Sequence, residues 1–491
     1  MKKTDQFLGL YALEKKLKVV GQLRLKGPET SLKLHADHEL ISTPSIPFIN
    51  GVAYSGEKLT LINCISPGHG SIFVDGQPTK YHAEIFPHHV AIGSSHLNPK
   101  VLEVTSIQFT SSDFASLFYD FDAFNHSMDP KSIIDLALNK AREMRPVESG
   151  DHPIIAYFTG KMTVIEVMTG IGKISVHHTP RTNSGGPSGV YIKNRIVVSI
   201  EFKQPKIFNE AMNQMYEVAS FLSLNAGRIQ KIKDIKLFIT NDLSKREESI
   251  SIYSSYPWRD SQGSRQYQPH AGDMPLDPIR RPEEFKTTLS NWIGRHDSWR
   301  VARTRYFDCL GMGNMFDAGR LISAANMFDL LPSDAIKIPT ELSDELIDAR
   351  DRSKEMFKGL PDGVDRNSVL NALGRLGKPS LPKKINYRVS VIEPNIGSIF
   401  PELQLVANTA VKCRNFFVHG PSDDFDWNKV ESSLPFLTNA LEFIFSASDL
   451  IEAGWDAQRW GSGNYGQGSS FVRFRADYDF ELAELKRALF D

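Results

Sequence analysis

Arg414, Asn415 and His419 are the residues of this chain whose types and spacing could do chemistry. An arginine can hold a phosphate group, and an imidazole can accept and donate protons near neutral pH. The apolar spacing before them predicts a helix over residues 400–418, and Gly420-Pro421 predicts its end. His419 is therefore expected in the last helical turn or just beyond it.

The position of Arg414 in this helix is unusual for a structural residue. Apolar side chains recur at helical spacing up to Ala410, and the next step of four falls on Arg414. A charge at such a position is costly unless it is paired or faces a ligand. Five residues turn about 140° around a helix axis, so Arg414 and His419 are not expected to share a face. At the end of the helix both side chains can still reach one pocket, which a second subunit would complete.

The same residues also have a structural explanation. Cationic side chains are favoured at helix C-termini by the helix dipole. Composition alone predicts roughly one Arg-x4-His spacing in a chain of this kind. A second one exists at Arg265 and His270, in a Pro-rich segment with no helix to hold it. Spacing alone therefore does not assign the site.

Other candidate sites are weaker, and no cofactor or metal is expected. The histidine pairs at 88–89 and 177–178 lack the Cys, Asp or Glu spacing of a metal site. The glycine-rich segment 184–189 lacks the Gly-Lys-Ser/Thr ending of a phosphate-binding loop. The three cysteines are far apart and odd in number, which favours a reducing compartment over a disulfide framework.

Length and composition indicate a multidomain globular protein. The chain has 491 residues, is 41% hydrophobic and 23% charged, and carries a formal net charge of -1. Any nucleic-acid binding must therefore use a local basic patch. The N-terminal residues do not form a signal peptide, and no apolar run is long enough for a transmembrane helix. We expect a cytoplasmic protein that does not bind membranes.

The hydrophobic patterns predict an α+β multidomain chain, with a β-rich region at residues 1–255, a linker at 256–284 and a helical bundle at 285–491. The β-rich region divides into two candidate subdomains, 1–150 and 151–255, and its strands suggest an antiparallel sheet, sandwich or open barrel. The expected helices cover residues 130–144, 208–224, 285–307, 320–331, 341–358, 366–376, 400–418, 436–453 and 480–490.

The stretch Arg414-Asn415-Phe416-Phe417-Val418-His419 resembles the Arg-polar-x3-His motif of HEPN domains, which are helical bundles and in many cases metal-independent ribonucleases. The organisation resembles ApeA-type antiphage proteins, where a β-rich N-terminal region precedes a C-terminal HEPN domain. Residues 21–27 and 32–34 are similar to the opening strands of that region. One departure concerns the helix expected at 320–331, where HEPN domains often carry an acidic residue and this chain has Asn326.

The resemblance implies a cytoplasmic endoribonuclease that acts as a homodimer or higher homo-oligomer in abortive infection. In this interpretation His419 transfers protons, Arg414 holds the scissile phosphate, and Asn415 orients the histidine or a phosphate oxygen. The substrate would be tRNA or another host RNA, and the N-terminal region would sense a phage-derived trigger or restrain the nuclease. Two alternatives stay open: a non-catalytic HEPN-like module for RNA binding, nucleotide binding or dimerisation, and a carbohydrate- or peptide-binding β-domain with a helical oligomerisation tail.

Overall fold

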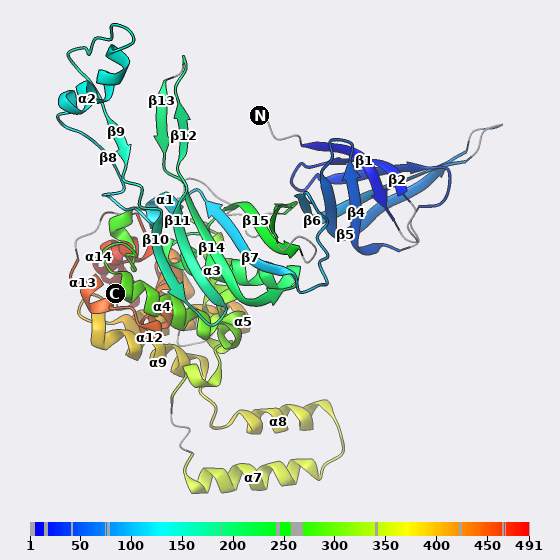
Figure 1. Ribbon diagram of the computed structural model, residues 1–491. Coiled ribbons are helices and arrows are strands. Elements are labelled where there is room, and N and C mark those ends of the chain that lie inside the picture. Colours follow the sequence, from blue (N-terminus) through cyan, green and yellow to red (C-terminus); the bar gives the residue numbers. More distant parts are fainter. Residues whose placement is uncertain are drawn as a thin grey trace. The chain divides into compact units, whose positions relative to one another are not determined.

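The computed structural model describes residues 5–13, 18–40, 43–73, 75, 79–187, 189–241, 246–256, 269–338, 342–421, 425–463, 466 and 468–490. The chain forms two compact units, one of which extends to Gly294 while the other continues from Arg295. The described strands all lie in the first unit, and the second is helical (Figure 1). The expected order, a β-rich region followed by a helical one, is confirmed.

Six of the described strands form a closed antiparallel barrel. Their order is β6-β3-β2-β1-β4-β5, and β5 pairs again with β6. Side chains that alternate along the strands, such as Tyr11, Leu23 and Leu34, are fully buried inside. The expected strands thus form a closed barrel, in which none of the six is an unpaired edge strand. The strand bounds are β1 Gln6–Ala12, β2 Lys18–Arg24, β3 Ser31–Ala36, β4 Ser45–Ala53, β5 Lys58–Ile72 and β6 Lys80–Gly93.

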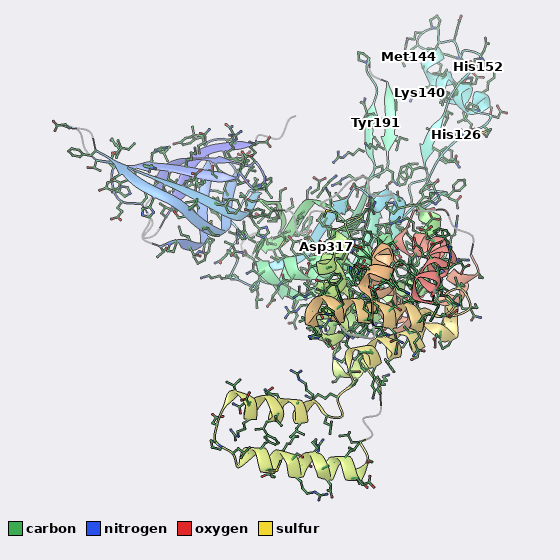
Figure 2. The ribbon with its side chains drawn as sticks, turned by 180° about the vertical axis from the view of Figure 1, so that it is seen from behind. His126, Lys140, Met144, His152, Tyr191 and Asp317 are labelled. Atoms are coloured by element: carbon green, nitrogen blue, oxygen red, sulfur yellow. The ribbon has the colours of Figure 1, made fainter. Side chains whose placement is uncertain are left out.

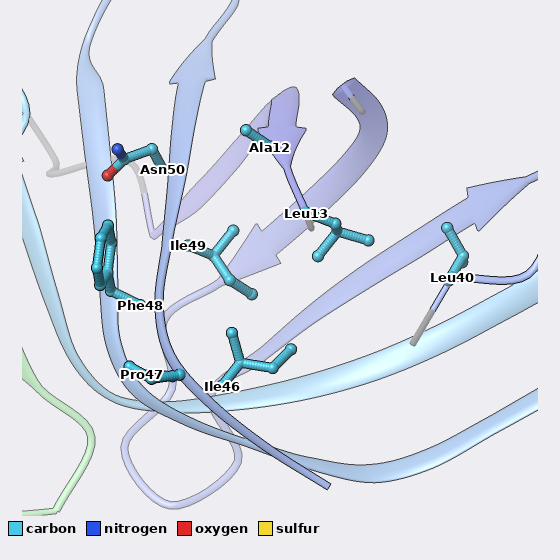
Figure 3. A pocket seen from close by; sticks show the side chains of 8 residues that line it. All are labelled: Ala12, Leu13, Leu40, Ile46, Pro47, Phe48, Ile49 and Asn50. Carbon is cyan, nitrogen blue, oxygen red and sulfur yellow. The ribbon is translucent and has the colours of Figure 1, made fainter. Parts of the chain in front are cut away.

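An apolar pocket of about 320 Å³ opens beside β1 and β4 of the barrel. Figure 3 shows its lining, which consists of Ala12, Leu13, Leu40, Ile46, Pro47, Phe48, Ile49 and Asn50. The Asn50 amide oxygen already accepts a hydrogen bond from Thr60 Oγ1 at 3.1 Å. This lining offers few of the hydrogen-bonding groups that a carbohydrate would need.

The long strand β6 connects the barrel to a second, open antiparallel sheet. That sheet has the order β16-β15-β7-β14-β11-β10, with β16 paired to the end of β6. Its inner side chains, including Ile107, Val198 and Leu237, are buried. The bounds are β7 Val104–Ser111, β10 Thr163–Met168, β11 Gly172–His178, β14 Ile196–Lys206, β15 Ile232–Asn241 and β16 Arg246–Ser254.

Two helices, α3 (Phe208–Ala226) and α4 (Pro282–Gly294), pack with this second sheet. The ring of Phe221 lies 5.7 Å from that of Phe285 and 5.6 Å from that of Trp292. The helix expected over 285–307 is therefore two helices, because α4 ends at Gly294 and α5 starts at His296. The division between the compact units lies ten residues beyond the expected end of the linker at 284.

Part of the expected linker is packed rather than extended. Within the described residues from 269 onward, Met274 and Leu276 are buried beside α3. The Asn225 side chain donates to Leu276 O at 3.0 Å and accepts from Leu276 N at 2.9 Å. This segment therefore joins α4 to the β-rich unit through both backbone and side-chain contacts.

Several short elements extend from the second sheet. They are α1 (Phe114–Leu117), β8 (Phe124–His126), α2 (Lys131–Arg142), β9 (Ala156–Phe158), β12 (Arg181–Ser184) and β13 (Val190–Lys193). Helix α2 has no buried residue. Figure 2 shows Lys140 and Met144 at this extension and Tyr191 on the β12–β13 hairpin.

The second unit is a helical bundle around α12. Its helices are α5 His296–Gly311, α6 Ala318–Asp329, α7 Asp344–Lys358, α8 Val364–Arg375, α9 Leu381–Ile396, α10 Leu403–His419, α11 Trp427–Val430, α12 Leu434–Ala453, α13 Ala457–Gly461 and α14 Ser470–Phe490. Helices α7 and α8 pack on each other and contain no buried residue.

One helical stretch, Trp427–Ala453, is long and apolar enough to cross a membrane by length and composition. However, 78% of its apolar window is buried inside the protein. This is the burial of a core helix.

Candidate active site at the end of helix α10

The sequence of α10 explains both its burial and its end. The side chains of Val406, Ala410 and Cys413 are buried at helical spacing against the neighbouring helices. At the C-terminus, Gly420 has φ 91° and ψ -179°, a conformation that residues with a Cβ rarely adopt. Its N–H donates to Phe416 O at 2.9 Å. The helix therefore ends at His419, as the sequence predicts.

The structure brings Arg414, Asn415 and His419 together. Arg414 Nη1 donates to Asn415 Oδ1 at 3.1 Å and lies 3.4 Å from His419 Nε2. Arg414 is half-buried, whereas Asn415 and His419 are exposed. Although five residues separate arginine and histidine around the helix, the long arginine side chain reaches the final turn. Both groups are thus available to one ligand within a single chain.

The contact between Arg414 and His419 places the two groups side by side. A guanidinium has donors but no acceptor, so a hydrogen bond between them requires a lone pair on His419 Nε2. A cation and a group that can transfer protons thus lie next to each other at the end of α10.

A fourth residue, Asn326, completes the cluster from α6. Its Oδ1 accepts a hydrogen bond from Arg414 Nη2 at 3.1 Å. Arg414 Nε is buried, and among the described residues it has no hydrogen-bond partner. Sequence reasoning noted Asn326 only as a departure from an acidic pattern and did not expect it to contact the motif. The available signal was its position in the middle of an amphipathic helix.

Helix α6 is firmly held, and this fixes Asn326. Asp317, labelled in Figure 2, caps the helix by accepting from Arg320 N at 2.7 Å. The Arg320 guanidinium binds Glu442 of α12 through two hydrogen bonds of 2.7 and 3.0 Å. Both partners are buried, so this ion pair ties α6 to the central helix.

Arg414 differs from the buried arginines of the same unit in the kind of partner it has. Those arginines pair with carboxylates, namely Arg303 with Asp449, Arg320 with Glu442 and Arg388 with Glu452. Within the described residues, Arg414 contacts two amide oxygens and an imidazole, and no carboxylate lies within 4.0 Å. A half-buried charge with no carboxylate partner among the described residues, which do not include 422–424, is typical of a site that binds an anion.

Aromatic packing by residues after the helix stabilises the C-terminal end of α10. The ring of Trp427 lies 4.7 Å from that of Phe417 and is stacked 6.1 Å from that of Phe416. Trp427 opens α11, whose N-cap Asp426 accepts from Asn428 N at 3.0 Å. The last turn of α10 is therefore held by side chains that follow it in sequence.

The second Arg-x4-His match does not form a comparable cluster that can be described. Arg265 lies outside the described residues. His270 precedes the short helix η2 (Ala271–Asp273), and its Nδ1 accepts from Gly272 N at 3.2 Å. This histidine therefore has a local capping role.

Comparison with known families assigns both halves of the chain. Residues 7–292 match the family model described as ApeA N-terminal domain 1, and residues 322–459 match the one described as Apea-like HEPN. The chain belongs to the ApeA family, as the resemblance implied. Neither the curated proteins nor the solved structures contain a match.

The two family matches agree with the division of the structure. The first ends within α4, close to the limit of the first compact unit, and the second begins within α6, before Asn326, and includes all of α10. HEPN domains are generally ribonucleases. Membership of the family therefore points to an antiphage protein with a HEPN-type nuclease domain.

Proposed function

We propose that this protein is a metal-independent endoribonuclease that acts in antiphage defence by abortive infection. The observation that carries the proposal is the cluster of Arg414, Asn415 and His419 at the exposed end of α10. It combines a cation for a phosphate, an amide that contacts this cation, and an imidazole that can transfer protons. The protein would work in the cytoplasm on tRNA or another host RNA.

The chemistry is an internal transesterification of RNA. His419 accepts the proton of a ribose 2′-OH, and the 2′-oxygen attacks the adjacent phosphorus atom. A P–O2′ bond forms while the P–O5′ bond breaks, and the leaving 5′-oxygen takes up a proton. The Arg414 guanidinium binds the non-bridging oxygens, where negative charge accumulates in the transition state. The products are a 2′,3′-cyclic phosphate and a 5′-hydroxyl, and no water is consumed.

The reaction needs an acid as well as a base, and this supports a proposed homodimer. One His419 serves as the base for the 2′-OH. The proton for the 5′-oxygen is supplied by His419 of a second copy, with the two α10 ends placed at one RNA strand. The exposure of His419 and Asn415 leaves both side chains accessible to such an arrangement. In this proposal the β-rich unit senses a phage-derived trigger or restrains the nuclease until infection.

The test is to sequence RNA ends that carry cyclic phosphates in phage-infected cells producing the full-length protein. Cells with the wild-type chain should accumulate such ends at defined positions, and His419→Ala and Arg414→Ala should abolish them. His270→Ala is a matched control, because it removes the histidine of the other Arg-x4-His spacing. Cleavage that persists in both motif variants would refute the assignment of the site.

The alternative is a HEPN-like module that binds RNA or nucleotides without cutting them. It predicts RNA binding that depends on Arg414, with no cyclic-phosphate ends under any condition. The half-buried, uncompensated charge of Arg414 fits either outcome. The imidazole beside Arg414 favours the enzyme, because a purely phosphate-binding site has no need of a group that transfers protons.

A further inference from the structure

We infer that Asn326 is a positioning residue that aims the Arg414 guanidinium at the substrate phosphate while leaving its positive charge intact. This inference rests on the proposed function, since it concerns the same site. Asn326 does not itself touch the reacting atoms. It acts through one hydrogen bond, from Arg414 Nη2 to Asn326 Oδ1, of 3.1 Å.

The geometry shows how the guanidinium is oriented. Asn326 on α6 accepts from Nη2, while Asn415 on α10 accepts from Nη1, beside His419 Nε2. The two amide oxygens come from different helices and engage different nitrogens, so the plane of the guanidinium is fixed in two directions. An arginine held only by its own helix would keep more rotamer freedom.

The support for Asn326 is rigid. Its neighbours Met327 and Phe328 are fully buried, and α6 packs directly against α10. The ion pair between Arg320 and Glu442 fixes the same helix one and a half turns earlier. Movement of the Asn326 amide would therefore require movement of the bundle core.

The chemical identity of Asn326 matters because an amide oxygen accepts hydrogen bonds without carrying a charge. A carboxylate at this position would stand where Glu442 stands relative to Arg320, and it would neutralise the guanidinium. A neutralised arginine attracts a phosphate much less. Asn326 thus orients the guanidinium without compensating its positive charge, which can then attract the RNA. The buried arginines Arg303, Arg320 and Arg388, in contrast, are paired with carboxylates.

Asn326→Asp tests the effect of charge alone. Aspartate has the same shape as asparagine and can accept the same hydrogen bond from Arg414, but it adds a negative charge. Binding of a single-stranded RNA oligonucleotide to the full-length His419→Ala protein avoids cleavage during the measurement. We expect Asn326→Asp in that background to bind more weakly. The slope of log K against log salt should be shallower by about 0.7, which corresponds to one phosphate contact on a single strand.

Asn326→Ala should behave differently, because it removes the hydrogen bond that orients Arg414 but leaves the charge of Arg414 unchanged. In the protein with His419 intact we expect kcat to fall about 10-fold or more, with little change in KM or in the salt slope of RNA binding. In the Arg414→Lys background, which should keep a measurable rate, Asn326→Ala should have no further effect on kcat, since Asn326 acts only through the Arg414 guanidinium.

Asn386→Asp is the matched control. Asn386 also joins two helices, donating to Asn408 Oδ1 at 3.2 Å, but it contacts no arginine in the described part of the chain. It should leave the salt slope unchanged. Thermal unfolding of each variant shows whether the fold is retained. If Asn326→Asp is unfolded, the cycle of Asn326→Ala with Arg414→Lys, read in kcat, decides the question.

The inference is overturned if Asn326→Asp binds RNA with the affinity and salt slope of the His419→Ala parent protein. It is equally overturned if the effects of Asn326→Ala and Arg414→Lys on kcat are additive, since Asn326 would then act elsewhere. The first result does not depend on RNA cleavage. A protein that binds RNA through Arg414 but never cuts it refutes the proposed function and still tests Asn326 through binding.

Discussion

Arg414 Nη1 lies 3.4 Å from His419 Nε2 although the two residues are five positions apart on one helix. The sequence placed them on different faces, and this holds for their backbone positions. The long arginine side chain spans this separation and reaches the imidazole at the last turn. A single chain thus brings the cation and the imidazole together, and in the proposed mechanism a second copy supplies only the acid.

Arg414→Lys should show that the shape of the cation matters as well as its charge. A lysine keeps the positive charge but has one nitrogen, so it cannot contact Asn326 and Asn415 while binding a phosphate bidentately. We expect cleavage to fall about 100-fold, within the range seen when one transition-state donor is lost. RNA binding at low salt should change much less. Equal cleavage by the lysine variant would show that the two-helix orientation is irrelevant.

Gly420→Ala should disturb the site without altering any motif residue. At φ 91° and ψ -179° an alanine is strained by about 1–3 kcal/mol, even though no atom lies within 4 Å of the added Cβ. The last turn should fray and carry His419 away from Arg414. The measurement is RNA cleavage together with thermal unfolding. Gly150→Ala, in open space and without a positive φ, should be neutral in both.

Glu442→Gln should destabilise the helical unit strongly. It leaves the buried Arg320 charge uncompensated, which typically costs about 3–5 kcal/mol. Denaturant unfolding of the full-length protein measures this loss. Glu355→Gln removes an exposed partner of Lys358 and should change the free energy of unfolding by less than about 1 kcal/mol. A small effect at Glu442 would mean that neighbouring carbonyls suffice to hold Arg320.

Acidification should destabilise both units through buried histidines. Burial lowers the pKa of His89 to about 4, with a further contribution from His88, and burial lowers the pKa of His296 to about 4, aided by Arg303. Between about pH 6.5 and 4 the unfolded chain binds protons that the folded chain refuses, so stability falls as pH decreases through this window. The melting temperature should therefore be lower at pH 5 than at pH 7. His89→Gln should reduce that difference, and an unchanged difference would contradict the role of His89.

Hydrophobic periodicity predicted most elements of the fold. Helices α3, α10 and α12 have apolar stripes and glycine ends, and their observed bounds lie within a few residues of the expected ones. The prediction of a single helix over residues 285–307 was wrong, because nothing in the apolar spacing marks the break at Gly294-Arg295. Helix α9 was not predicted, because Pro382 and Pro394 are typical of loops. In the structure Pro382 lies in the first turn of α9 and Pro394 in the last.

The candidate site could be predicted only in part. Arg414, Asn415 and His419 are neighbours in sequence, so their helix and its glycine end already brought them near one another. Asn326 is 88 positions from Arg414, and its contact depends on how α6 packs against α10. No local pattern encodes such a pairing. The assignment of the three motif residues to catalysis stays a prediction until cleavage is measured.

The place of α4 in the first unit determines where this protein can be divided. A β-rich fragment that stopped before α4 would expose the rings of Phe118 and Phe221, which Phe285 covers, and we expect it to aggregate. A fragment of the helical unit should begin at Arg295, because this side chain binds Asp449 and Glu452 of α12. The bond between Gly294 and Arg295 is thus the natural cutting point for expressing either half alone or for exchanging β-rich halves between relatives.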